Sequence, residues 1–546
     1  MARLPSASRY RVERDPLGEM RVPAAAYYGV QTLRAVENFP ISGLKAPAEL
    51  IAATVLVKKA AADANRSLER LPARIADAIV AAADEILDGK LRAHFVVDVY
   101  QAGAGTSHNM NANEVIANRA SEILGGERGE YTLVHPNDHV NMGQSTNDVF
   151  PTATRLAILS MVPALLSAAR ALARSLRDRG DEFSRVLKTG RTHLQDAVPM
   201  TLGQEFGGFA AAVDHAATEL ETTSAQLLEL NLGASALGTG LNAGSDYAAR
   251  AVGNLADYTG LRLRPAANYF RVTQSMGDVL AYSGALRRLA VEVGKVASDL
   301  RLLSMGPRAG IAEIKLPAVQ PGSSIMPGKV NPSVPEMVNQ VCFQVLGCDA
   351  TILAAADAGQ LELNVMMPVI AWNAIHASRI MTNAMRVLQE RCVDGVRADE
   401  ARCRELLDRS TAVATALSPY IGYAATAAIA KTAVETGRSI RDLVREQQLL
   451  DDDRLDAVLS AESMTTPGIA GGSLAKGHQS ETSIEHARGD RRGRGGARHR
   501  AADRGAARPA VPAKGSGAAR GSGSRRLAAA GSRDGRARHR RRQRRR

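Results

Sequence analysis

Two adjacent serines and one lysine stand in an irregular segment, GSSIMPGKVNP, at residues 322–332. Ser323 and Ser324 lie between two glycines, and Lys329 follows Ser323 by six residues. A serine hydroxyl can remove a proton only where its alkoxide is stabilised, and backbone N–H groups freed by glycine together with a nearby ammonium are the usual means. The segment therefore predicts a mobile catalytic loop. A surface turn with a solvated lysine is the alternative.

Three further segments are rich in Ser, Thr, Asn and His. They are GAGTSHNMNANE at 103–114, PNDHVNMGQSTNDVFP at 136–151 and GRTHLQDAVPMTLGQE at 190–205. Small hydroxyls and amides are the groups with which a protein surrounds carboxylate oxygens, so the segments are candidates for substrate binding. Taken singly, each segment also has a structural explanation as a helix cap or a turn. The residues with such an alternative are Thr106, Asn147, Asp148, Thr192 and Asp196, and His193 could be an ordinary core or surface histidine.

Long helices must position these polar segments. Helical periodicity covers residues 48–90 with a break at Pro72. Strand signals are few and aromatic residues make up 4% of the chain, so Ala and Leu must fill the core of a mainly α, long-helix bundle. Ala-rich helices bury little area each, which favours a homo-oligomer. Comparable helical patterns cover residues 151–179, interrupted at Pro163, and residues 201–231, 274–304 and 333–390.

The positive charge of the 546-residue chain is concentrated at its C-terminal end. The formal net charge is +13, yet residues 471–546 alone hold 22 Lys and Arg against 5 Asp and Glu. Residues 1–470 therefore carry a mildly acidic charge of −4, the difference between +13 and +17. From Arg488 onward the tail lacks aromatic residues and cannot build a core. We interpret it as non-functional sequence, such as an out-of-frame extension, with RNA or DNA binding as the alternative.

Neither cysteine spacing nor the N-terminus indicates a secreted or zinc-binding protein. The four cysteines form no CxxC pair, so we expect reduced, packed thiols. MARLPSASRYRVERD carries charges where a signal peptide needs an apolar core, which favours a cytoplasmic location. Residues 410–430 are uncharged, but Pro419 and Gly422 break them, so we expect two short packed helices instead of a membrane span. We expect no organic cofactor and no metal cluster. A response to magnesium stays open.

The string GSSIMPGKVNP resembles the signature loop of the fumarase/aspartase superfamily. Members include class II fumarases and the aspartate, argininosuccinate and adenylosuccinate lyases, which eliminate a group across a C–C bond to release fumarate. The resemblance spans roughly residues 10–465. Three stretches look more like aspartate ammonia-lyases than fumarases. They are VDVYQAGAGTSHNMNANEV at 97–115, LELNLGASALGTGLN at 228–242 and PSVPEMVNQVCFQVLG at 332–347.

The resemblance implies a role for each polar segment in the deamination of L-aspartate to fumarate. Ser323 would be the general base that takes the C3 proton, and the proton's removal would give an aci-carboxylate dianion. Gly322 and Gly328 would be hinges of the loop. The donors to the charge-gathering carboxylate would be Thr106, Ser145, Thr146 and Ser324; the other carboxylate would be held by Lys329, Asn331 and Thr192, and Asn147 and His193 would lie near the departing amine.

One predicted role stays open even within the resemblance. In fumarases the histidine at the His193 position is paired with a glutamate that corresponds to Glu336, whereas some aspartases have glutamine in place of the histidine. His193 could therefore transfer a proton or only hydrogen-bond the substrate. A class II fumarase acting on L-malate stays as an alternative function. So does a non-catalytic protein on a lyase scaffold with a nucleic-acid-binding tail, although the intact serine loop argues against it.

The resemblance also implies a three-domain subunit that assembles into a homotetramer with a helical core. Active sites in this family draw their donor regions from three different subunits, which would explain why the motifs lie far apart in the sequence. The predicted domains are residues 1–146, an N-terminal domain; 147–401, a central helical bundle; 402–470, a small C-terminal helical domain; and 471–546, a disordered basic tail.

Overall fold

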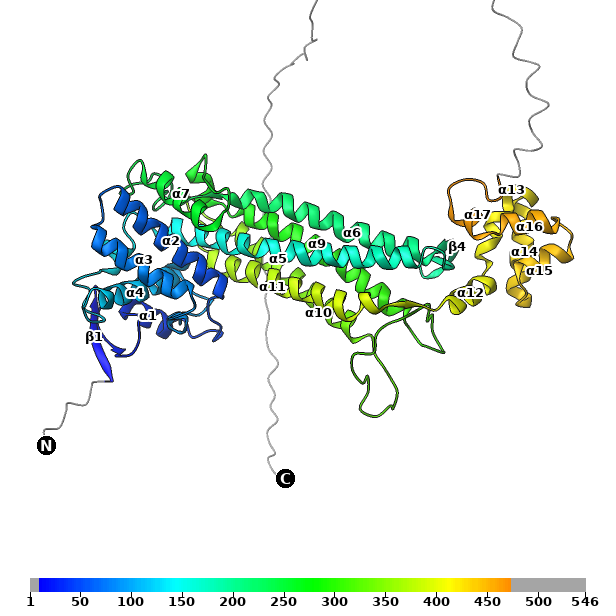
Figure 1. The fold of residues 1–546 in the computed structure, drawn as a ribbon, viewed down its shortest axis with the longest axis horizontal. Helices are drawn as coiled ribbons and strands as arrows, with labels where there is room; N and C mark the ends of the chain where they lie inside the picture. The colour runs from blue at the N-terminus through cyan, green and yellow to red at the C-terminus, as the bar shows by residue number, and fades with distance from the viewer. Residues whose placement is uncertain (1–8, 473–546) are drawn as a thin grey trace, which may run out of the picture. The chain divides into compact units, whose positions relative to one another are not determined.

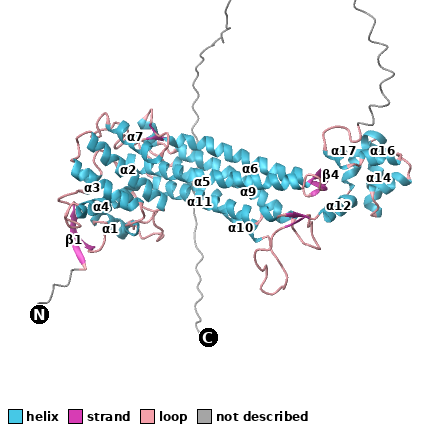
Figure 2. Ribbon diagram, in the orientation of Figure 1, coloured by secondary structure: helices cyan, strands magenta, loops and turns pink. Residues whose placement is uncertain are grey.

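The structure is a computed structural model that describes residues 9–472, all within one compact unit of the chain. The predicted basic tail lies almost wholly outside the described residues. Helices dominate, as expected (Figure 2). The strands form four two-stranded sheets, three of them antiparallel and one, β5 with β6, parallel. The strands are β1 Tyr10–Asp15, β2 Gly18–Pro23, β3 Leu187–Thr192, β4 Gln195–Thr201, β5 Glu229–Leu230, β6 Arg264–Pro265, β7 Ile314–Lys315 and β8 Arg397–Ala398.

Five long helices pack side by side into a bundle (Figure 1). One continuous hydrophobic cluster, made mostly of Ala, Leu and Val, fills the space between them. Helices with such apolar stripes stabilise one another by burying them, which explains why a chain with few aromatic residues still forms a large core. By length and composition alone α5 and α10 would pass for membrane spans, as core helices do. The bundle helices are α5 Thr146–Glu182, α6 Leu202–Ser224, α9 Gly277–Leu303, α10 Ser333–Asp357 and α11 Met367–Arg391.

The bundle corrects two of the expected helix boundaries. Helix α5 begins at Thr146 instead of Pro151 and runs through Pro163 without ending. Pro163 is exposed, and the buried apolar residues on both sides of it outweigh the cost of a proline inside a helix, about 3 kcal/mol for the lost hydrogen bond and the ring clash together. The pattern over 333–390 is two helices, because Asn364 folds back and donates from Nδ2 to the carbonyl oxygen of Ala355 at 2.9 Å. This bond satisfies a free carbonyl at the end of α10.

The N-terminal helices surround a second hydrophobic cluster. The break expected at Pro72 is confirmed, since α2 ends before it and α3 starts after it. The predicted helical run at 201–231 stops at Ser224 and continues as a short 3-10 turn. The remaining helices of this part and its connections are α1 Val30–Asn38, α2 Ala48–Ser67, α3 Ala73–Leu87, α4 Thr106–Ile123, α7 Tyr247–Thr259 and α8 Tyr269–Gln274, with short turns η1 Arg92–His94, η2 Gly103–Gly105, η3 Pro136–Val140 and η4 Ala225–Leu228.

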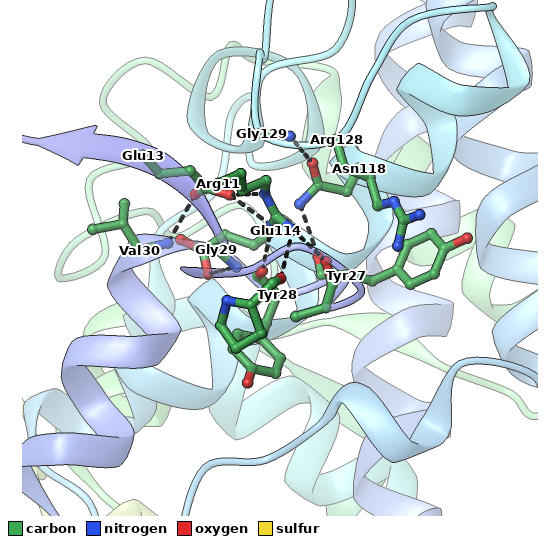
Figure 3. A network of polar contacts seen from close by, with 12 residues as sticks. Arg11, Glu13, Tyr27, Tyr28, Gly29, Val30, Glu114, Asn118, Arg128 and Gly129 are labelled. Atoms are coloured by element: carbon green, nitrogen blue, oxygen red, sulfur yellow. Dashed lines mark hydrogen bonds and ion pairs between the residues drawn. The ribbon is translucent and has the colours of Figure 1, made fainter. Parts of the chain in front are cut away.

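A buried polar network fixes α4 against the N-terminal hairpin (Figure 3). Glu114 of α4 is 1% exposed and its Oε2 accepts from the Gly29 N–H at 2.8 Å. Glu13 accepts from the Val30 N–H at 2.9 Å, so two carboxylates cap the first turn of α1. Burial raises the pKa of Glu114 to about 7. Asn118, one turn further along α4, donates to the Tyr27 carbonyl oxygen at 2.8 Å. These bonds hold α4 in place against the segment that follows the hairpin.

Short helices with their own hydrophobic cluster end the described chain. Residues 410–430 form a 3-10 turn and two helices that meet at Gly422, whose φ of +80° favours glycine. The two expected short helices are therefore confirmed, with a 3-10 segment before them. These elements are η5 Val393–Gly395, η6 Thr411–Leu417, α12 Glu400–Arg409, α13 Ser418–Ile421, α14 Tyr423–Thr436, α15 Ile440–Glu446, α16 Asp452–Val458 and α17 Ala461–Thr465.

Candidate active site

The segment Ser145–Asn147 forms the N-terminus of α5. Ser145 is the N-cap, and its Oγ accepts from the Asn147 N–H at 3.2 Å. Asp148 completes a capping box by accepting from the Ser145 N–H at 2.9 Å. The first turn of a long helix presents free N–H groups and the positive end of the helix dipole, which favour an anion. Asp148, not Asn147, therefore has the capping role that the sequence left open, and it shares that role with Ser145.

Asp148 also holds a second segment beside this helix end. The carboxylate is 0% exposed and its Oδ2 accepts from the N–H groups of Gly233 at 3.1 Å and Ser235 at 2.9 Å. Burial raises the pKa of Asp148 to about 7, although the backbone donors oppose that shift. Asn147 donates to the Ala236 carbonyl oxygen at 2.8 Å. The stretch 228–242 is thus fixed against the donors of α5.

Thr106 begins α4 next to the same helix end. The preceding Gly105 has a φ of +97°, and a Cβ there would meet the Phe150 ring at 2.2 Å, so only glycine lets α4 approach α5 this closely. Thr106 is exposed, and its hydroxyl donates to the Gly103 carbonyl oxygen at 2.6 Å. Asn109 of α4 donates from Nδ2 to Thr146 Oγ1 at 3.1 Å. The structure therefore brings Thr106, Ser145, Thr146 and Asn147 to two adjacent helix N-termini, a group we call the donor end.

Thr192 and His193 lie at the tip of the β3–β4 hairpin. His193 and Leu194 have φ values of +55° and +59°, as the two-residue turn of such a hairpin requires. Both predicted site residues are exposed. Glu336, the suggested partner of His193, lies exposed in the first turn of α10, and within residues 9–472 neither a hydrogen bond nor an ion pair joins the two.

The predicted serine loop is an irregular segment that ends where α10 begins at Ser333. Ser323 Oγ accepts from the N–H groups of Ile325 at 3.2 Å and Met326 at 3.0 Å. Two N–H donors on one hydroxyl oxygen stabilise negative charge there, which is what a serine base needs. The neck of the loop is closed by the Gly322 N–H, which donates to the Lys329 carbonyl oxygen at 2.8 Å.

The neck also explains one of the two glycines of the loop. Asn331 Nδ2 donates to the Gly322 carbonyl oxygen at 2.8 Å. A Cβ on Gly322 would lie 2.7 Å from the backbone nitrogen of Asn331, so there is no room for a side chain at residue 322. Gly328 has a φ of +79° and space around it, so it is needed for its conformation. The side chains of Ser324 and Lys329 are exposed, and Ile325 is 84% exposed. The loop thus presents its functional groups outward.

A buried ion-pair cluster ties the hairpin to the base of the loop. Glu313, which precedes β7, is 0% exposed and accepts from both terminal nitrogens of Arg191, at 3.0 and 2.9 Å. Lys188 of β3 lies 3.1 Å from the same carboxylate. Thr192 and His193 directly follow Arg191 in the chain. The hairpin and the serine loop are therefore at the same end of the bundle, which we call the loop end.

The donor end and the loop end are far apart within one chain. Helix α5 starts at Thr146, runs for 37 residues and is followed by the hairpin. At 1.5 Å per residue, a helix of that length spans roughly 55 Å. Figure 1 shows β4 at one end of the bundle and α2–α4 at the other. One chain thus brings the predicted residues together as two separate groups, and a site that uses both needs residues from more than one chain.

Metal ligands and reactive thiols are not features of the described chain. Within residues 9–472 there is no group of three or more His, Cys, Asp or Glu side chains that would hold a metal ion. All four cysteines are free and buried, as expected. Burial raises the pKa of Cys342 to about 12, so this thiol stays protonated.

The helical bundle and the polar segments define a lyase of the fumarase type. The sequence profile of a family described as Lyase matches residues 18–347, and the profile of the fumarase C C-terminus matches residues 413–466. The chain therefore belongs to the fumarase/aspartase family of lyases, which confirms the resemblance. A class II fumarase from Schistosoma mansoni has a TM-score of 0.81 at 36% sequence identity, covering 84% of this chain and all of that one.

Within that family the chain is similar to several aspartate ammonia-lyases. The enzyme of Pseudomonas fluorescens is 52% identical over 467 residues, which covers 85% of this chain and 98% of that enzyme. The Bacillus subtilis (strain 168) enzyme is 49% identical with the same coverage. A fumarate lyase:delta crystallin from Brucella melitensis, solved with bound cobalt, has a TM-score of 0.81 at 50% identity and covers 84% of this chain and all of that one.

Several residues that support these groups were not predicted from the sequence. Glu313 and Arg191 are among them, because their pairing joins segments that are distant in the chain. Lys58 is another: it lies in an Ala-rich helix, and the only signal is that Leu50, Thr54 and Lys58 recur every fourth residue and so share the buried face.

Proposed function

We propose that this chain is an aspartate ammonia-lyase that converts L-aspartate reversibly to fumarate and ammonia. The observation that carries the proposal is the identity of about half of all aligned residues with several aspartate ammonia-lyases, over nearly their whole length. The helical fold and the two groups of polar residues agree with it. The identity to the fumarase of known structure is lower, at 36%.

Ser323 is the base in the proposed mechanism. The C3 proton of aspartate is barely acidic, and removing it puts a second negative charge on the neighbouring carboxylate. The N–H groups of Ile325 and Met326 already donate to Ser323 Oγ and lower the cost of the alkoxide. Lys329, exposed in the same loop, adds a positive charge that binds the other carboxylate. Asn331 and Thr192 would help to bind that second carboxylate.

The donor end stabilises the charge that develops. Its threonine and serine hydroxyls and the dipole of α5 provide preorganised donors for the aci-carboxylate, so they contribute most in the transition state. Thr106, Ser145 and Thr146 have this role, and Ser324 joins them when the loop closes at Gly322 and Gly328. Asn147 and His193 face the departing amine, and Glu336 supports His193.

We infer a homotetramer, and the separation of the two groups supports an assembly of more than one chain. Because roughly 55 Å separates the donor end from the hairpin along α5, a complete site needs at least two chains. Apolar side chains are exposed along the bundle, and a second copy of the chain would cover them. Phe343 of α10 is 67% exposed and Val291 of α9 is 50% exposed. We infer the three-domain division given above and a cytoplasmic location for this soluble enzyme family.

The proposal is tested by incubating the full chain separately with L-aspartate and with L-malate while fumarate is followed by ultraviolet absorbance. Fumarate from aspartate is expected, at a rate far above that from malate. Fumarate from malate alone would instead identify a fumarase. Fumarate from neither would favour a non-catalytic protein.

A further inference from the structure

Lys58 of α2 has a buried amino group that the proposed reaction does not use. Its side chain is 0% exposed, and its ammonium donates to Asn141 Oδ1 at 2.8 Å and to Gln144 Oε1 at 3.0 Å. Among residues 9–472 no carboxylate forms an ion pair with it. A buried charge paired only with amide oxygens costs stability, so a purely structural position would be better filled by an apolar residue.

A chain of hydrogen bonds leads from Lys58 to the donor end. Asn141 Oδ1, which accepts from Lys58, also accepts from Asn109 Nδ2 at 3.2 Å. The same Nδ2 group donates its other proton to Thr146 Oγ1 at 3.1 Å. Asn109 is 1% exposed, so water does not compete for these bonds. Lys58 is thus two side chains away from a hydroxyl that is proposed to bind the charge-gathering carboxylate.

The chain of hydrogen bonds has a direction that the lysine helps to fix. Lys58 donates to Asn141 Oδ1, and so does Asn113 Nδ2 at 3.2 Å, while Asn141 Nδ2 donates to the Gln144 carbonyl oxygen at 3.1 Å. Asn141 therefore turns its oxygen toward Lys58. With that oxygen fixed, Asn109 must present its NH2 group to both Asn141 and Thr146. Thr146 Oγ1 then accepts from Asn109, and its own proton remains available for a ligand. Without Lys58, Asn141 loses the shortest of the bonds that hold its oxygen, at 2.8 Å, and the orientation of Asn109 toward Thr146 is held less firmly.

Burial lowers the pKa of Lys58 to about 7, and the charge of nearby Asp148 opposes that shift. His108 lies on the adjacent face of α4 and bonds Thr54 Oγ1 through Nε2 at 2.9 Å. Burial, followed by the charge of Lys58, lowers the pKa of His108 to about 4, so the imidazole is neutral at pH 7. Asp148 is the charged group of opposite sign that acts on Lys58, and its oxygens are taken up by backbone N–H groups.

We propose that Lys58 is a positioning residue for the lyase reaction, which acts through Asn141 and Asn109 to hold the Thr146 hydroxyl as a donor to the aci-carboxylate. The inference rests on the proposed function. It adds a residue outside the substrate's reach whose effect appears only as charge develops.

The first test is the variant Lys58→Met, which keeps the length of the side chain and removes its donors. We expect kcat for aspartate to fall about thirtyfold while KM stays within about threefold, because the lost interaction belongs to the transition state. The matched control is Lys59→Met. Lys59 is the next residue of α2 but pairs with Asp84 at 2.6 Å, away from the chain of amides, and its loss leaves kcat unchanged.

The deciding readout compares two inhibitors. Succinate is a ground-state dicarboxylate, whereas the nitronate of 3-nitropropanoate carries the charge pattern of the aci-carboxylate. Lys58→Met is expected to weaken nitronate binding about thirtyfold and succinate binding less than about threefold. Equal weakening of both inhibitors, or a kcat within about twofold of wild type, would overturn the proposal, since a merely structural role affects both ligands alike.

Two further variants keep the test conclusive. If Lys58→Met does not fold, Asn109→Leu cuts the chain nearer the site, and the same selective loss of nitronate binding is expected; unchanged nitronate binding in that variant contradicts the proposal. In nitronate affinity, which an inactive variant still reports, combining Lys58→Met with Thr146→Val should cost no more than the larger single effect, and additive losses of affinity would show that Lys58 does not act through Thr146. Wild type that makes no fumarate from aspartate refutes the proposed function itself, whereas a defect confined to variants concerns Lys58 alone.

Discussion

Ser145 at the donor end and Ser323 at the loop end have the same side chain in opposite settings. Ser145 caps a 37-residue helix, and its bonds are shared with a fully buried carboxylate. Within residues 9–472, Ser323 bonds only to N–H groups of its own loop, and most residues of this loop are exposed. The difference indicates a division of labour: the groups that receive charge are fixed before substrate arrives, whereas the base is on a segment that can move.

The largest expected effect is at the loop end. Ser323→Ala removes the base and should lower kcat by roughly a thousandfold, within the range of general-base contributions. Because the hydroxyl bonds only within its loop, the free energy of unfolding should change by less than about 0.5 kcal/mol. Fumarate absorbance and denaturant titration measure the two quantities. Ser67→Ala, which removes a hydroxyl bonded to Ala64 far from either group, serves as the control. A Ser323→Ala variant that kept more than a tenth of wild-type kcat would show that Ser323 is not the base.

The donor end should respond in the opposite way. Asp148→Ala leaves the N–H groups of Ser145, Gly233 and Ser235 without an acceptor in a buried place. We expect the free energy of unfolding to fall by about 4 kcal/mol, together with activity, since each unsatisfied buried group costs about 1–3 kcal/mol. The midpoint in denaturant measures this change. A stable but inactive Asp148→Ala protein would mean that the donor end is not preorganised by this carboxylate.

Acid should weaken the donor end through His108. The unfolded chain binds a proton at this residue near pH 6.5 and the folded chain only near pH 4, so stability is lost as the pH falls through that window. Relative to His108→Gln, wild type should lose up to about 3 kcal/mol of unfolding free energy between pH 7 and pH 4. The contributions of Asp148 and Glu114 cancel in this difference. Parallel pH curves for the two proteins would show that the site around His108 is hydrated.

The smallest effect expected is that of the helix cap. Ser145→Ala removes one capping bond and should cost about 1 kcal/mol of unfolding free energy. We expect kcat to fall by more than about tenfold, because the same hydroxyl is proposed to bind the substrate. Thermal unfolding and fumarate release distinguish the two. An activity loss no larger than tenfold would make Ser145 a cap and nothing more.

Local chemistry explains what could be predicted from the sequence. Periodicity gave the long helices, and the polar segments stood out because serine, threonine and asparagine replaced surface lysine and glutamate. The interruption of the run at 333–390 was not predictable, since Asn364 ends α10 by a contact from beyond the helix. Lys58 and Glu313 were missed for the same reason: their partners come from other segments, and no spacing reveals a buried amide chain or an ion pair that joins a hairpin to a loop.

The family could be identified from one loop, but the composite nature of the site depended on geometry. Nothing in GSSIMPGKVNP shows how far it lies from Thr146. The length of α5 does, because a helix cannot bend its two ends together. The same length makes the shared site the central claim for this enzyme.

Mixing two inactive variants tests that claim most directly. Ser323→Ala and Thr146→Val are unfolded together, allowed to reassemble, and assayed for fumarate from L-aspartate, with each variant reassembled alone as the control. If the loop and the donor end of a site come from different chains, random mixing of equal amounts restores about a quarter of wild-type activity. A working site needs an intact loop from one chain and an intact donor end from another, and each of these has a chance of about one half. Activity no higher than that of the separate variants would show that each site is built within one chain.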